Sequence, residues 1–184
     1  AGVKIDRMVL SPMPRAIATA LATCEGYGSA DMPLSLEPRM GDFKSDPRTP
    51  KAAVKALKAM SKERYGDDSD ANLAKCLIDT PALHELLFLR AQEGAQALCD
   101  IAMEHPGIHE TILVVSHGVA RMEISLRCLQ GKKAMDLLQI ADKLIDRGQI
   151  IELTFEDGFE GVGTEFISAK PWTPPLPEPP CRCL

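Results

Sequence analysis

Length, composition and charge indicate one globular domain and exclude two classes of partner. The 184 residues carry a formal net charge of −5, 45% of them are hydrophobic and 4% are aromatic. A nucleic-acid surface needs a basic face and usually aromatic platforms for the bases, so we expect no nucleic acid as a partner. No apolar run is long enough to span a membrane and the first residues lack a signal-peptide pattern, so we expect a cytoplasmic protein without a membrane partner.

The beginning of the chain predicts a strand followed by a helix. Residues 5–10 form a short apolar strand that stops at Ser11-Pro12, because proline cannot continue a ladder of strand hydrogen bonds. The alanine-rich run 15–22 consists of strong helix formers and is expected to pack closely on a sheet.

The next part of the chain predicts a long loop and then short helices. Glycine, proline and acidic residues dominate positions 26–50, so we expect mostly loop there. Thr49 is expected to cap a helix that begins with Pro50. We interpret residues 26–80 as a loop and helical cap over the functional site.

The second half of the chain predicts helices that alternate with strands. One long amphipathic helix is expected from Thr80-Pro81 to about His105. Later elements are expected in this order: a strand at 112–115, a helix at 119–129 ending near Gly131, a helix through 135–144, and two strands at 149–155 and 164–169. The domain is expected to cover residues 1–170, with a proline-rich extended tail at 171–184.

The six cysteines are scattered without a Cys-x-x-Cys pair, which is typical of reduced thiols in the cytosol. Cys76, Cys99 and Cys128 lie in helical patterns, where a free cysteine behaves as a small apolar residue. Cys181 and Cys183 lie in the tail, where a metal site or a crosslink is the alternative to an inert end.

The strand at 112–115 indicates where the functional site lies. This run is apolar and mostly β-branched, which is typical of a parallel strand covered on both faces. Ser116, His117 and Gly118 follow it and precede a helix. Open α/β sheets bind ligands at the carboxyl ends of their strands, and a helix amino terminus favours an anion. A polar helix cap is the alternative reading of His117.

Three segments together resemble the histidine phosphatase superfamily, whose fold is phosphoglycerate-mutase-like. Residues 11–20 read Ser-Pro-Met-Pro-Arg-Ala-Ile-Ala-Thr-Ala, residues 35–42 read Ser-Leu-Glu-Pro-Arg-Met-Gly-Asp, and residues 115–118 read Val-Ser-His-Gly. The resemblance covers about residues 5–155. It implies an α/β fold in which a mostly parallel sheet lies inside a three-layer α/β/α sandwich.

The resemblance also implies a phosphate pocket, to which Ser11 and Gly118 contribute. Arg15 and His117 would bind the transferring phosphoryl group, while Glu37 would protonate the leaving oxygen. A guanidinium offers a planar, permanently charged fork for phosphoryl oxygens, and a histidine can donate to the same oxygens in the transition state. Glu37 must be protonated to act, so we expect a raised pKa. An exposed surface Arg15 and a solvated Glu37 are the alternatives.

One part of the family pattern is missing. The family begins with a strand that ends in Arg-His-Gly and carries the nucleophilic histidine, and this chain has no such segment. His84, His105 and His109 are expected to be structural or solvated. Loss of that strand from the middle of the sheet would expose apolar edges on its neighbours. We therefore expect the nucleophile upstream of Ala1.

The first hypothesis is a phosphomonoester hydrolase that acts through a phosphohistidine on a small phosphorylated substrate. This mechanism requires neither a metal nor a cofactor. A phosphoglycerate-mutase-type phosphotransferase is the closest alternative. A non-catalytic module that binds a phosphorylated ligand is a second, should the chain start at Ala1, and an α/β interaction protein is a third. The sequence predicts no particular oligomeric state.

Overall fold

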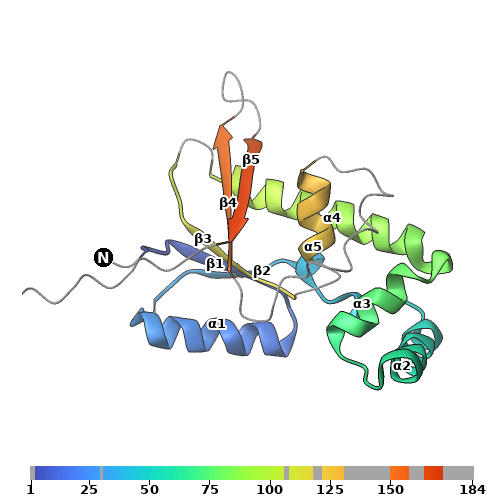
Figure 1. Cartoon of the computed structure of the whole chain (residues 1–184). Helices are drawn as coiled ribbons and strands as arrows, with labels where there is room; N and C mark the ends of the chain where they lie inside the picture. The colour runs from blue at the N-terminus through green and yellow to red at the C-terminus, as the bar shows by residue number, and fades with distance from the viewer. Residues whose placement is uncertain are drawn as a thin grey trace, which may run out of the picture.

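The structure is a computed structural model that describes residues 3–29, 31–105, 108–117, 122–130, 150–157 and 164–171 (Figure 1). It is a mixed α/β structure with a small parallel sheet and several helices. Its elements are β1 (Arg7–Leu10), α1 (Pro14–Tyr27), β2 (Leu34–Leu36), η1 (Pro38–Met40), η2 (Phe43–Ser45), α2 (Lys51–Tyr65), α3 (Asp70–Ile78), η3 (Pro81–Leu83), α4 (His84–Met103), β3 (Ile112–Val115), α5 (Met122–Leu129), β4 (Ile151–Asp157) and β5 (Thr164–Pro171). The helix expected at 135–144, Gly118 and the tail from 172 lie outside the described residues.

The parallel sheet has the order β2-β1-β3, with β1 in the middle. Val9 is paired with Ser35 on one side and with Val114 on the other. The strands predicted at 5–10 and 112–115 are confirmed as β1 and β3. Strand β2 lies in a stretch that was predicted to be loop. Two of its three residues are leucines, and it satisfies the backbone groups along the second edge of β1.

The strand β3 is less buried than predicted. All four residues of β1 are buried, but all four of β3 are half-buried. The difference follows from position, because β3 pairs with β1 along one edge and no described strand pairs with its other edge.

The last two strands form a separate antiparallel hairpin, as predicted, with an irregularity between Thr154 and Phe155. No described residue of β4 is paired with β3, yet the two strands share one core. Ile151, Leu153 and Phe155 of β4 pack against the same buried residues as Ile112 and Val114 of β3.

Alternate residues of β1 pack against different helices. Met8 and Leu10 pack against Ala20 and Cys24 of α1. Val9 packs instead with a cluster that includes Ala97, Leu98 and Ile101 of α4 and Leu126 of α5. Figure 1 shows α1 on the opposite side of the strands from α4 and α5. This alternation follows from the two-residue period of a strand.

The helices α2 and α3 pack on the first half of α4, away from the strands (Figure 1). Their shared core contains Leu57, Leu77 and Leu87, and Phe43 inserts into it from η2. Thr49 does not cap α2 as predicted, because its hydroxyl donates to the carbonyl of Phe43 at 2.7 Å and Pro50 occupies the cap position. The role of residues 26–80 as a cap over the site stays a prediction.

Candidate functional site

The candidate site lies where β1 and β3 end side by side. Ser11 follows β1, and its backbone N–H donates to the carbonyl of Val115, the last residue of β3, at 2.9 Å. Arg15 lies in the first turn of α1, which begins with proline at Pro14. The parallel register therefore brings Ser11, Arg15 and His117 together at the carboxyl ends of these strands.

Arg15 and His117 are in direct contact although 102 positions separate them in the sequence. Arg15 Nε donates to His117 Nδ1 at 3.0 Å, and His117 Nε2 lies 2.7 Å from Ser11 Oγ. A guanidinium can only donate, so Nδ1 accepts and the ring proton of a neutral His117 resides on Nε2. His117 thus donates to Ser11 and does not act as a base toward its hydroxyl, which argues against a serine nucleophile of the Ser-His type.

The exposure of the three side chains differs. Ser11 is 0% and His117 is 7% exposed, whereas the side chain of Arg15 is 57% exposed. A ligand from solvent therefore meets Arg15 first. The buried His117 orients the guanidinium by accepting the hydrogen bond from Arg15 Nε.

A carboxylate that the sequence did not assign to the site completes the arrangement. Asp42 Oδ2 lies 2.6 Å from Arg15 Nη2, and the Asp42 side chain is 11% exposed. Nε and Nη2 form one edge of the planar guanidinium, so His117 and Asp42 together occupy that edge. Within the described part of the chain, Arg15 Nη1 makes no hydrogen bond or ion pair.

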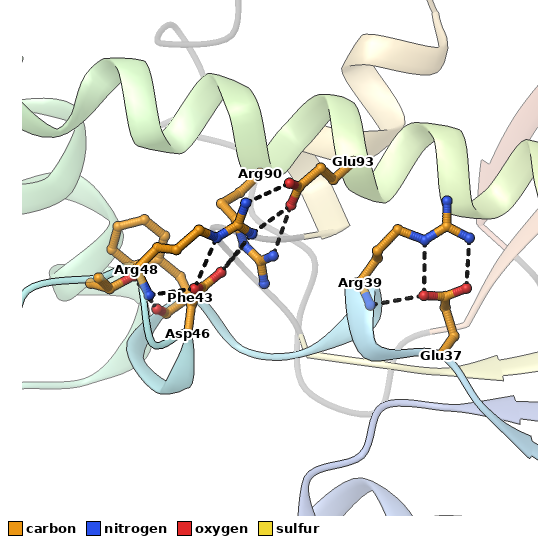
Figure 2. Close-up of polar contacts among 8 residues, drawn as sticks. Glu37, Arg39, Phe43, Asp46, Arg48, Arg90 and Glu93 are labelled. Carbon is orange, nitrogen blue, oxygen red and sulfur yellow. Dashed lines mark hydrogen bonds and ion pairs between the residues drawn. The ribbon is translucent and has the colours of Figure 1, made fainter.

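Glu37 lies at the same end of the sheet, since it follows β2 and its N–H donates to the carbonyl of Leu10 at 2.8 Å. Its carboxylate faces Arg39, which donates from its backbone N–H, Nε and Nη2 at 2.7 to 2.9 Å (Figure 2). These hydrogen bonds from Arg39 lower the pKa of Glu37 despite its partial burial. The expectation of a raised pKa is therefore wrong for this arrangement, in which Glu37 is ionised.

Arg39 connects Glu37 to the long helix. Its Nη1 also pairs with Asp100 of α4. Glu37, Arg39 and Asp100 line an open groove of about 470 Å³, whose other walls include Val9, Leu36 and Ile101. This groove lies beside β2 and α4, and neither Arg15 nor His117 lines it.

The segment that carries Asp42 is held against α4 by a second charged cluster (Figure 2). Asp46 pairs with Arg48 at 2.9 Å and with Arg90 of α4 at 2.7 Å, while Glu93 of α4 pairs with both arginines. Burial raises the pKa of Asp46, but Arg48 and Arg90 outweigh this effect and the net pKa is lowered. Hydrogen bonds from Arg48 lower the pKa of Glu93 to about 2.

Two other histidines and three cysteines in the described part of the chain lie in other surroundings. His84 Nε2 lies 2.6 Å from the carbonyl of Ile78, and His105 pairs with Glu110 near the amino end of β3. Burial raises the pKa of the thiols Cys76, Cys99 and Cys128, so none of these three is an activated nucleophile. Among the described residues, no three His, Cys, Asp or Glu side chains are grouped so that they could hold a metal ion.

Comparison of the chain with protein-family models gives no match, and comparison with curated proteins gives no significant similarity. None of the helices in the described ranges is both long enough and apolar enough to cross a membrane.

Proposed function

We propose that the carboxyl edge of β1 and β3 binds the phosphoryl group of a small phosphomonoester, and that the protein hydrolyses this ester through a phosphohistidine. The observation that carries the proposal is the hydrogen bond of 3.0 Å between Arg15 and His117 at the ends of adjacent parallel strands. It supports the resemblance to the histidine phosphatase superfamily, and with it a three-layer, phosphoglycerate-mutase-like arrangement. A mutase would use the same pocket and return the phosphoryl group to its substrate.

The physical basis is stabilisation of charge at a site already organised for it. Arg15 is fixed at Nε and Nη2 and exposed elsewhere, so it presents a positioned cation to an incoming phosphate. Little covalent assistance is needed for phosphoryl transfer beyond positioning and electrostatic stabilisation of the equatorial oxygens. The nearby amino end of α1 adds backbone dipoles of the same sign.

The mechanism needs a nucleophilic histidine besides His117. His84 and His105 lie in other contacts, and His109 is exposed at the opposite end of β3. We therefore propose that the nucleophile is carried upstream of Ala1, on a strand that would pair with the second edge of β3. Glu37 remains the proposed acid, because a phosphate dianion bound near it would favour its protonated form.

A non-catalytic phosphate-binding module is the second candidate. One observation favours it. Arg15 and His117 are hydrogen-bonded to each other at the site, whereas Arg39 keeps Glu37 ionised, so that Glu37 has no proton to donate. Turnover separates the two candidates. The module predicts phosphate binding that depends on Arg15 but no hydrolysis.

The test is hydrolysis of nitrophenyl phosphate and of an alkyl phosphate by the full-length protein. Arg15→Ala and His117→Ala are each expected to reduce turnover on the order of 10² to 10³, because the first removes a preorganised donor and the second removes the contact that positions it. Arg64→Ala is the matched control, because Arg64 forms an exposed ion pair with Asp79 on other helices. Turnover that is unchanged in both site variants would refute the assignment.

Glu37→Gln tests the acid separately. It is expected to reduce hydrolysis of the alkyl phosphate more than that of the nitrophenyl ester, whose leaving group needs no proton. An equal loss on both substrates would show that another group is the acid.

A further inference from the structure

Asp42 contacts the one nitrogen of Arg15 that belongs to both edges of the guanidinium. An arginine can bind two oxygens at once through its Nε and Nη2 edge or its Nη1 and Nη2 edge, and Nη2 has one N–H on each of them. Asp42 Oδ2 is 2.6 Å from that shared nitrogen. A phosphate that accepts from the other N–H of Nη2 therefore lies close to the carboxylate of Asp42 and is repelled by its charge.

The competing carboxylate is held in place by its own segment. Asp42 is followed by Phe43, which is buried in the core between α2 and α4. Asp46 is fixed to Arg90 of α4, and Met40, two residues before Asp42, is 0% exposed. The carbonyl of Met40 accepts a hydrogen bond at 2.9 Å from the hydroxyl of Ser116, the residue before His117. Asp42 thus reaches Arg15 from a backbone fixed on both sides.

The described contacts of Arg15 determine the charge next to its guanidinium. The ion pair of Arg15 with Asp42 has no net charge, and His117 is neutral while its Nδ1 accepts from Arg15. A doubly charged anion gains attraction from Arg15 but also meets the repulsion of a carboxylate on the same guanidinium. A singly charged anion of the same shape meets half of that repulsion.

We propose that Asp42 is an internal counter-anion that sets the affinity and the charge preference of the Arg15 pocket. It weakens the binding of dianionic phosphate groups more than that of monoanionic ones, and it acts through Arg15. This inference rests on the proposed function, because it assumes that the pocket binds phosphate. It adds Asp42 as the residue that determines which anions the pocket accepts.

The experiment measures binding of sulfate and perrhenate by isothermal titration calorimetry with the full chain at neutral pH. Both probes are tetrahedral and do not titrate near neutrality, but sulfate carries two charges and perrhenate one. Asp42→Asn is expected to bind sulfate on the order of tenfold more tightly than the parent, with a smaller gain for perrhenate. Asp42→Ser is a second variant with the same expectation should the first not fold.

Two controls separate a local effect from a general change in net charge. Asp79→Asn removes one negative charge from an exposed ion pair with Arg64 and is expected to leave sulfate binding within about twofold of the parent. In an Arg15→Ala background, Asp42→Asn is expected to give no gain, because the carboxylate acts through the guanidinium. A gain that persists in this background would overturn the proposal.

The failures of the two proposals are distinguishable. Sulfate binding that depends on Arg15 but is unchanged or weaker in folded Asp42→Asn and Asp42→Ser overturns the role of Asp42 and leaves the phosphate pocket standing. Absence of sulfate binding in the parent and in both Asp42 variants overturns the pocket itself and this inference with it.

Discussion

Replacement of Arg90 by methionine removes the buried cation that connects the Asp42 segment to α4. The Arg90 side chain is 7% exposed, with Nε 2.7 Å from Asp46 Oδ2 and Nη1 2.8 Å from Glu93 Oε2. The Asp46 side chain is 2% exposed, so it would stay buried without its buried partner. Removing one partner of a buried ion pair generally lowers the free energy of unfolding by about 3–5 kcal/mol. Arg48 still contacts Asp46 at 2.9 Å, so we expect about 2–4 kcal/mol less stability.

The assay is urea unfolding followed by circular dichroism, with Arg64→Met as the matched control. Arg64 pairs with Asp79 at 2.8 Å, and both side chains are about half exposed. An exposed pair contributes about 0–1 kcal/mol, so the control is expected to unfold close to the parent. If Arg90→Met lies within about 1 kcal/mol of the parent, or matches Arg64→Met, the reasoning about the buried cluster is wrong.

Acid stability depends on Glu93, and the stability of the core depends on Met40. The pKa of Glu93 is lowered from 4.5 to about 2 by hydrogen bonds from Arg48. Its ionised form therefore stabilises the fold fully above about pH 4.5, and this stability is lost as the pH falls toward 2. Glu93→Gln is expected to flatten the pH dependence of the urea midpoint in that window, and an unchanged slope would contradict the pairing. Met40 is 0% and Leu36 is 59% exposed, so Met40→Ala is expected to cost about 2–5 kcal/mol and Leu36→Ala less than about 1. Equal thermal shifts in these two variants would show that Met40 is not a core residue.

The sequence predicted the strands and helices that have a strong repeating pattern. The apolar run of β3, the stripe of α4 and the alternation in β4 are each long enough to indicate one element. Strand β2 escaped prediction because it has three residues, lies among prolines and acidic residues, and exposes all its side chains. It depends on pairing with β1, a long-range interaction that no local pattern encodes.

The candidate site was predicted to a similar extent. Arg15 and His117 were expected together because the resemblance of their segments to the histidine phosphatase superfamily implies one phosphate pocket, and the structure places Arg15 Nε 3.0 Å from His117 Nδ1. The pairing of Glu37 with Arg39 was not foreseen, although the two residues are separated only by Pro38. The contact of Asp42 with Arg15 spans 27 positions and depends on how η2 packs, which the sequence does not reveal locally.

The most direct test of the phosphate pocket is the affinity of the full-length protein for inorganic phosphate, measured by calorimetry for the parent, Arg15→Ala and Arg64→Ala. The parent is expected to bind phosphate and Arg64→Ala to bind it equally well. Arg15→Ala is expected to bind phosphate at least about tenfold more weakly, since it loses a charge-assisted contact. Phosphate binding by Arg15→Ala as tight as that of the parent would contradict the proposed phosphate pocket.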